Sequence, residues 1–219
     1  YCTVSLSSLY LDMLKDRLYT LAPDNPKRRS SQTALNMILH ALTRMLAPML
    51  SFTAEEVWRS IPNQPDLESS IHLASWPEVD QRFVDDEIGE RWENLLQVRS
   101  IVTKALENAR RDGRIGNSLE ARVVLYPERK EEELLLRRFD DMLSSIFIVS
   151  QVELHAPGEA VPEDISVKEN TLTVAVHTAS GSKCKRCWNF RESVGKIEEH
   201  PSLCERCVNE LRKTGGSNE

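Results

Sequence analysis

Apolar residues recur every three or four positions through the first half of the chain, which is the spacing of one face of an α-helix. One such stripe occupies residues 6–18, and a second occupies residues 35–49. Two prolines between the stripes, Pro23 and Pro26, interrupt the helical pattern. The pattern therefore predicts two amphipathic helices joined by a short link.

A candidate capping box and a proline-containing segment follow the second stripe. Thr53 lies three residues before Glu56, a spacing at which the two side chains cap the start of a helix reciprocally. We therefore expect a short helix that begins there and includes Trp58. Residues 62–80 hold three prolines and show no helical period, which predicts a loop.

The longest predicted helix covers residues 85–110. Its apolar residues alternate in steps of four and three, and Arg99 takes one position of the stripe. Gly113 and Gly116 end the pattern. Several amphipathic helices with short links are typical of an antiparallel bundle, which we assign to residues 1–116. The chain opens directly on an apolar stripe without an initiator Met, so we expect it to be a fragment whose helical domain is truncated at its N-terminus.

The apolar period changes from helical to alternating after this bundle, which predicts a small α+β module over residues 117–181. A helix is predicted over residues 131–142, and Glu169-Asn170 is the predicted hairpin turn. The predicted strands are residues 121–126, 146–154, 165–168 and 171–176. A zinc-binding module at 182–213 and a flexible tail at 214–219 complete the division. The fold class we predict is α+β, mainly α.

Charge is distributed unevenly along the 219 residues, whose net charge is -6. Residues 183–213 hold eight Lys/Arg against five Asp/Glu, a net of +3, whereas residues 1–182 carry a net of -8. This asymmetry indicates either an anionic partner for the C-terminal end or local compensation of a charged metal site. No run of roughly 18 apolar residues occurs, and no secretion signal is visible, so we expect a cytoplasmic protein without a membrane span.

Four cysteines form the strongest chemical pattern in the sequence: Cys184-x-x-Cys187, sixteen residues, then Cys204-x-x-Cys207. Two such pairs at this separation are a recognised zinc-site spacing, because each tight turn presents two thiolates to one tetrahedral ion. Disulfides are disfavoured without a secretion signal, and a redox site needs only one pair. Iron with the same ligands stays open. Four protein ligands leave no position for water, so we predict one structural zinc and no catalytic residue.

Basic residues and a tryptophan surround the cysteines and have two interpretations. The cations offset the charge of four thiolates on one Zn²⁺, or they contact RNA phosphates. Trp188 covers the metal site as core, or it presents a face to a base, which would contribute about 1–3 kcal/mol. The candidate RNA-contacting residues are Lys185, Arg186, Trp188, Arg191 and Arg206.

Several runs of sequence resemble one known family. Residues 9–19, 47–58, 70–77 and 115–121 resemble the anticodon-binding helical domain of bacterial-type isoleucyl-tRNA synthetase. The ending, Lys183-Cys-Lys-Arg-Cys-Trp188 with His200-Pro-Ser-Leu-Cys-Glu-Arg-Cys207, resembles the zinc-binding segment that closes this family. Valyl and leucyl enzymes have related helical domains, so the four-cysteine ending carries the specificity of the resemblance.

The resemblance implies the tRNA-recognition portion of an isoleucine–tRNA ligase, whose full-length form joins isoleucine to its tRNA with ATP. The chain would grip the anticodon end of isoleucine tRNA. It would lack the catalytic core and the editing domain, which are its expected intramolecular partners, and it would be inactive alone. We also expect a monomer. The alternative is a zinc-stabilised protein- or DNA-interaction module without a role in aminoacylation, since certain DNA glycosylases end in a similar zinc segment. A third interpretation is a zinc module that only braces the C-terminus.

Overall fold

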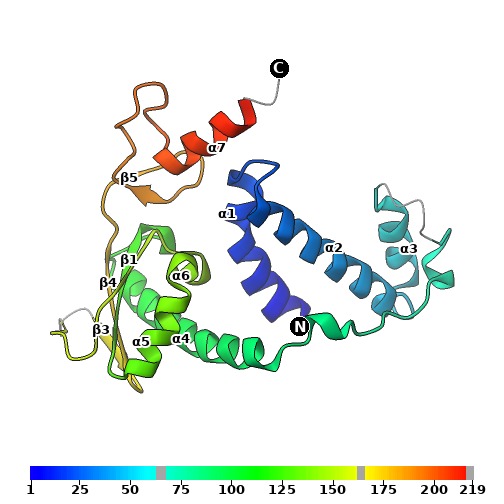
Figure 1. The fold of residues 1–219 in the computed structure, drawn as a ribbon, viewed down its shortest axis with the longest axis horizontal. Helices are drawn as coiled ribbons and strands as arrows, with labels where there is room; N and C mark the ends of the chain where they lie inside the picture. Colours follow the sequence, from blue (N-terminus) through cyan, green and yellow to red (C-terminus); the bar gives the residue numbers. More distant parts are fainter. Residues whose placement is uncertain (63–67, 162–165, 216–219) are drawn as a thin grey trace. The chain divides into compact units, whose positions relative to one another are not determined.

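The computed structural model describes residues 1–62, 68–161 and 166–215, and the chain divides into two compact units (Figure 1). Unit 1 joins Tyr1–Pro23 to Asp86–Glu219, and unit 2 is Asp24–Asp85. The predicted fold class is confirmed, because the chain is mainly helical with a small sheet and four cysteines close together.

Unit 2 is built on two helices, α2 (Pro26–Leu46) and α3 (Ser51–Ser60). Asn25 caps α2 by accepting a hydrogen bond from the Lys27 N–H, and Pro26 occupies the first helical turn, where its missing N–H costs nothing. The predicted capping box at Thr53 is wrong, because α3 begins two residues earlier and its N-cap, Leu50, makes no side-chain cap.

A short segment after α3 completes the small core of unit 2. It contains the 3₁₀ turns η2 (Ile71–Leu73) and η3 (Gln81–Phe83). The Trp58 indole donates to the Glu68 carbonyl at 2.9 Å, and the Glu55 carboxylate accepts from the Ile71 N–H at 3.0 Å. The buried apolar residues are Ala47, Ala54, Trp58 and Ile71. These contacts hold residues 68–74 of the predicted loop against α3, whereas residues 63–67 of that loop lie outside the described residues.

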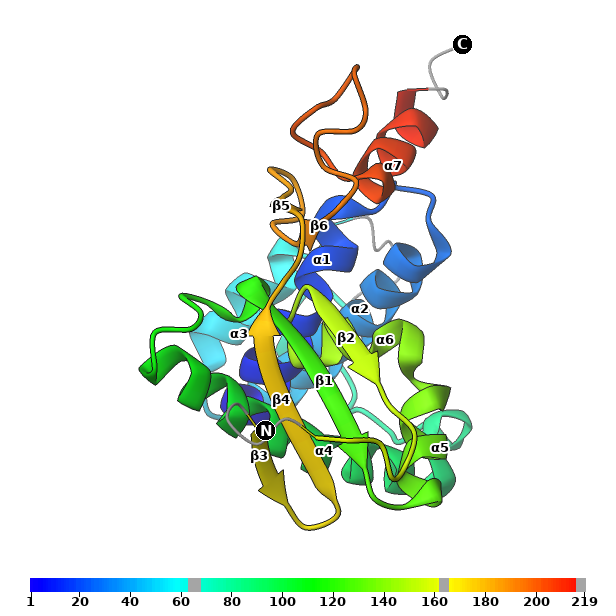
Figure 2. The ribbon, with the colours of Figure 1, turned by 90° about the vertical axis from the view of Figure 1, so that its left-hand side faces the viewer.

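Unit 1 contains the remaining elements (Figure 2). Its helices are η1 (Cys2–Leu11), which is a π-helix continuous with α1 (Asp12–Thr20), α4 (Asp86–Arg111), η4 (Ser118–Glu120), α5 (Lys130–Arg138), α6 (Asp140–Phe147) and α7 (Glu205–Gly215). Its strands are β1 (Ala121–Pro127), β2 (Gln151–Leu154), β3 (Ser166–Glu169), β4 (Leu172–Thr178), β5 (Ser182–Lys183) and β6 (Phe190–Arg191). Because α7 includes Thr214 and Gly215, the predicted tail at 214–219 begins too early; its other residues lie outside those described.

The central sheet has the strand order β2-β1-β4-β3. β1 pairs in parallel with β2 through the α5–α6 crossover, and it pairs antiparallel with β4, where Val123 lies opposite Val176 and Leu125 opposite Val174. β3 and β4 form the predicted hairpin, in which Asn170 takes a left-handed conformation with φ 54°. Ile165, at the start of the predicted third strand, lies outside the described residues.

Two predicted element boundaries in this region are wrong. The helix predicted over 131–142 is two helices that meet at Phe139. The strand predicted over 146–154 begins only at Gln151, because Ile146 and Phe147 belong to α6. Both side chains are buried in the main core, and the left-handed Ile148 (φ 57°) ends the helix immediately after them. A short apolar run of this kind fits either a strand or a buried helix, and tertiary packing decides between them.

Helix α4 packs on the sheet and supplies much of the main core of unit 1. Its buried residues are Leu95, Val98, Ile101, Val102, Ala105, Leu106 and Ala109. They share one apolar cluster with the inward side chains of β1 and β4, such as Val123 and Val174. The predicted start of the stripe, Ile88, is 47% exposed. The prediction of a buried face on this helix is confirmed. We expected that face to pack against other helices of a bundle, but in unit 1 it packs against strands.

Arg99, which interrupts the apolar stripe of α4, has a structural partner. Its Nε donates to the Ile146 carbonyl at 2.9 Å, near the C-terminal end of α6. Burial lowers the pKa of Arg99, and the charge of Asp12 opposes that effect. The arginine therefore satisfies a helix-end carbonyl that has no partner within its own helix.

Candidate metal centre

The first pair of cysteines lies on a tight turn between β5 and β6. The Cys184 N–H donates to the Asn189 carbonyl at 2.9 Å, and the Trp188 N–H donates to the Cys184 carbonyl at 2.9 Å. The Asn189 side chain donates to the Cys187 carbonyl at 3.1 Å. Trp188 closes the turn in the left-handed region, with φ 64°. The turn thus holds both thiols of the pair on one side.

Gly181 allows the two short strands that carry this turn to approach each other. Its φ is 84°, a conformation that side-chain-bearing residues rarely adopt. A Cβ atom at this position would lie 2.3 Å from the carbonyl carbon of Arg191. Glycine is therefore required both for the backbone conformation and for the space.

The second pair of cysteines lies at the start of α7. Cys204 immediately precedes the helix and Cys207 is in its first turn, where helical N–H groups favour negative charge. The Cys204 N–H points at the Cys184 sulfur, 3.3 Å away. The Lys185 N–H donates to the Ser202 carbonyl at 3.0 Å, which joins the two turns.

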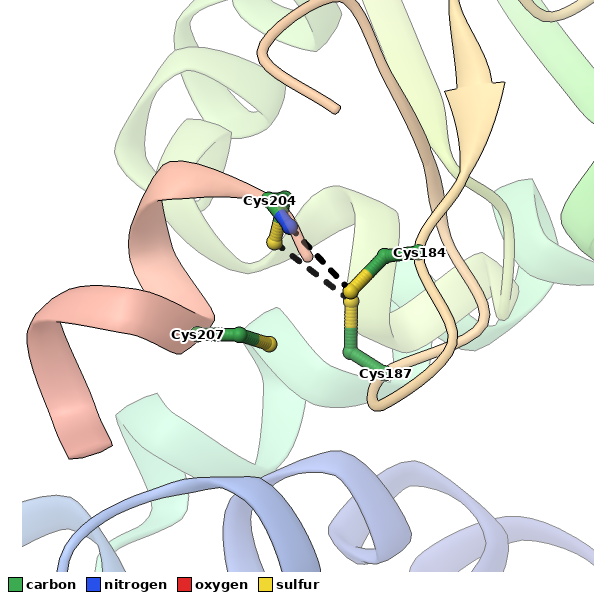
Figure 3. A group of neighbouring side chains, drawn as sticks. All are labelled: Cys184, Cys187, Cys204 and Cys207. Carbon is green, nitrogen blue, oxygen red and sulfur yellow. Dashed lines mark hydrogen bonds between the residues drawn. The ribbon is translucent and has the colours of Figure 1, made fainter. Parts of the chain in front are cut away.

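All four sulfur atoms lie within 4.8 Å of one another (Figure 3). Cys184, Cys204 and Cys207 are buried and Cys187 is partly buried. The Cys187 and Cys204 sulfurs are 3.7 Å apart. Zn–S bonds of about 2.3 Å in a tetrahedron place sulfurs about 3.8 Å apart, so the donor set fits a tetrahedral zinc.

Contacts among the sulfurs shift the pKa values of Cys187, Cys204 and Cys207 in different directions. A hydrogen bond from Cys207 lowers the pKa of Cys187 to about 4. Burial raises the pKa of Cys204, and donation to Cys187 raises the pKa of Cys207. One thiolate is therefore stabilised by its neighbours, whereas further ionisation would crowd like charges into a buried space. A divalent cation supplies the positive charge that allows all four thiols to ionise.

The residues proposed to touch RNA separate into two groups. Trp188 is 60% exposed, so it does not cover the metal site as core. The Lys183 ammonium lies 5.6 Å from the centre of the Trp188 ring, Lys185 is exposed, and Arg191 is partly exposed. These four residues share the β5–β6 turn and its flanks, and we call them the Trp188 patch.

Arg186 and Arg206 face helix α1. Arg206 forms a two-pronged ion pair with Asp16, in which Nη2 donates to Oδ1 at 2.7 Å and Nη1 donates to Oδ2. The hydrogen bonds to Asp16 raise the pKa of Arg206. Arg186 donates to the Thr20 carbonyl at 3.3 Å. Sequence reasoning missed these partners, because Asp16 and Thr20 lie more than 160 positions away and no local pattern links them to the zinc module.

Helices long and apolar enough to cross a bilayer are absent from the part of the chain that the structure describes.

Two known protein families match this chain, one over its N-terminal part and the other over its C-terminal end. The sequence model described as "Anticodon-binding domain of tRNA ligase" matches residues 1–125, more than half of the chain. The chain therefore belongs to the family of tRNA-ligase anticodon-binding domains. A second model, described as "Zinc finger found in FPG and IleRS", matches residues 181–209, which include all four cysteines. This match and the convergence of the thiols together establish one structural zinc.

Individual relatives are isoleucine–tRNA ligases. The Moorella thermoacetica ligase is 45% identical over 215 residues, which are 97% of this chain and 23% of the relative. The Syntrophotalea carbinolica ligase is 47% identical over 214 residues, 95% of this chain and 22% of the relative. The chain thus spans less than a quarter of the length of these relatives.

Proposed function

We propose that this chain is the tRNA-binding C-terminal portion of an isoleucine–tRNA ligase and recognises the anticodon end of isoleucine tRNA. The observation that carries the proposal is the pairing, within one chain, of an anticodon-binding domain at residues 1–125 with a zinc finger of the FPG and IleRS type at 181–209. Isoleucine–tRNA ligases about 45% identical over nearly the whole chain support it. The alternative, a protein- or DNA-interaction module, accounts for the zinc finger but not for the first match.

Cys184, Cys187, Cys204 and Cys207 are the proposed zinc ligands. Four thiolates fill a tetrahedral site and leave no open position for water or substrate, so the metal holds two turns together and takes no part in chemistry. The division of the chain into domains at 116/117 and 181/182 is also kept as a proposal. The first boundary lies five residues after α4 ends at Arg111, and the second precedes β5 and the cysteine turn.

The Trp188 patch is the proposed RNA contact of the zinc module. An exposed indole offers a face on which a base can stack, and the lysines beside it can neutralise phosphates. Of the five residues predicted from the sequence, Lys185, Trp188 and Arg191 keep this role. Arg186 and Arg206 are weaker candidates for this role, because their guanidinium groups already donate hydrogen bonds to α1.

Catalysis in this proposal belongs to the remainder of the ligase. The catalytic core, with its ATP site, and the editing domain are parts of the full-length enzyme, which acts as a cytoplasmic monomer. The 219-residue chain alone should support no ATP–pyrophosphate exchange with isoleucine. Adenylate formation by the purified chain would contradict this division of labour.

A filter-binding comparison distinguishes the two functions. We expect the zinc-loaded chain to bind isoleucine tRNA at least about tenfold more tightly than duplex DNA of equal length and at equal salt. Binding should weaken steeply with salt, since phosphate contacts release counterions. Equal affinity for the two nucleic acids would favour the interaction-module alternative.

A further inference from the structure

The zinc module makes polar contacts with two separate parts of unit 1. On one side it meets the C-terminal end of α1, and on the other it meets the start of β2 (Figure 2). Nothing in a zinc-binding or RNA-binding role requires these contacts, yet they involve buried groups on both sides.

Three contacts join the zinc module to the end of α1. Besides the Arg206–Asp16 ion pair and the Arg186–Thr20 hydrogen bond, the Glu210 carboxylate accepts from the Ala22 N–H at 2.7 Å. Glu210 and Ala22 are both buried. Thr20 is the last residue of α1, and carbonyls at a helix end lack partners within the helix. The module therefore satisfies backbone groups that the end of α1 leaves open.

Two further residues join the module to the sheet. The Ser150 hydroxyl is fully buried; it accepts from the Phe190 N–H at 2.7 Å and donates to the Leu119 carbonyl at 2.5 Å. The Gln151 side chain donates to the Phe190 carbonyl at 3.4 Å, and it also accepts from the N–H of Ser180, two residues before the module, at 3.1 Å. These bonds anchor the β5–β6 turn to the edge of the sheet at β2.

We infer that the zinc module is a spacer that fixes the end of α1 relative to the sheet, with Arg206 and Glu210 as its positioning residues. Both lie on α7, whose start carries Cys204 and Cys207, so the metal that orders this turn also sets where the two side chains reach. Zinc occupancy is thereby coupled to the order of residues 16–22. Because this coupling is a property of the chain itself, it does not depend on the proposed tRNA function.

Hydrogen exchange on the zinc-loaded 219-residue chain tests the inference. Glu210→Ala removes the acceptor of the Ala22 N–H, and hydrogen bonds to charged groups are strong enough that its exchange should accelerate about tenfold or more. Amides of β1 and β4 should be unchanged, and zinc content should stay at one per chain. Arg212→Ala is the matched control, because it breaks an α7 ion pair with Glu199, inside the zinc module. Equal exchange of Ala22 in both variants would overturn the inference.

A second variant lies outside the zinc module and keeps the test decisive if Glu210→Ala loses its metal. Coupling between two sites is reciprocal at equilibrium, so Asp16→Asn should weaken zinc affinity, measured by competition with a chelator, by about threefold or more. Arg206→Gln should have a similar effect, and the double variant should bind zinc no more weakly than the weaker single variant, because both remove the same ion pair. Additive effects, or wild-type zinc affinity of Asp16→Asn, would contradict the positioning role.

Discussion

Trp188 combines a left-handed backbone with an exposed aromatic side chain. Its backbone is left-handed, with φ 64°, and its large apolar side chain is 60% exposed. A non-glycine residue in this region costs of order 1 kcal/mol and persists only where its surroundings impose it. Here the surroundings are the hydrogen bonds of the cysteine turn, which hold the ring outward beside Lys183. This combination of backbone strain and an exposed indole supports the proposed role of Trp188 in RNA binding.

Trp188→Ala should therefore affect binding more than stability. We expect tRNA affinity to fall about tenfold, since stacking on an aromatic ring contributes about 1–3 kcal/mol per base. The free energy of unfolding should change by less than about 1 kcal/mol because little buried area is lost. Trp188→Phe, which keeps a ring, is the control in filter binding and urea denaturation. An alanine variant with wild-type tRNA affinity would remove Trp188 from the interface.

Substitution of Gly181 and of Gly195 distinguishes the cost of a left-handed backbone from the cost of a steric clash. Both have a positive φ, 90° at Gly195 and 84° at Gly181, but a Cβ atom added at Gly195 would meet nothing within 4 Å, whereas one at Gly181 would meet the Arg191 backbone. Gly195→Ala should cost about 1 kcal/mol, the cost of a left-handed alanine. Gly181→Ala should cost several times more and lower zinc retention after dialysis. Equal stability of the two variants in urea denaturation would contradict the close approach of β5 and β6.

At the scale of elements, periodicity identified α1, α2 and α4 but did not identify what each one packs against. The apolar stripe of α4 could pack equally well against a helix or a sheet, so the period alone did not predict its partner. Long-range contacts decide this, and in the structure the stripe packs against the sheet. The same ambiguity misassigned Ile146 and Phe147 to a strand. The cysteine site was predictable because ligand spacing is local within each pair. The partners of Arg186 and Arg206 were not, since their contacts span the length of the chain.

Trp92 tests how firmly α4 is attached to its neighbours. Its ring packs against Phe139, with centroids 5.9 Å apart, at the border of the main core. Trp92→Ala should lower the free energy of unfolding by about 3 kcal/mol, the low end of values for large aromatic truncations, because the ring is only partly buried. Ile88→Ala on the same helix, at a 47% exposed position, should cost less than about 1 kcal/mol. Indistinguishable melting curves for the two variants would show that α4 is not held at Trp92.

At the scale of the whole molecule, one apolar cluster and one metal site hold unit 1 together by different means. The cluster contains α4, the sheet, α5 and α6 and needs no metal. The zinc module has too few large apolar residues to fold alone, because segments below about 40 residues usually need a metal or disulfides. Its folding free energy must therefore come largely from metal binding.

Removal of zinc should consequently unfold one part of the chain and spare another. After chelation we expect amides of residues 182–213 to exchange freely and those of residues 16–22 to lose protection, while the β1 and β4 amides stay protected. Most of the helical circular dichroism should remain, because α7 is one short helix among several. Loss of protection across β1 and β4 would show that the main core depends on the metal.

The central claim is that this chain recognises the anticodon end of isoleucine tRNA. The most direct test measures, by filter binding at fixed salt, the affinity of the zinc-loaded chain for isoleucine tRNA and for the same tRNA with its anticodon replaced. Direct contact with the anticodon predicts binding of the unmodified tRNA at least about tenfold more tightly, since each lost stacking contact is worth about 1–3 kcal/mol. Equal affinity for the two tRNAs would contradict the account.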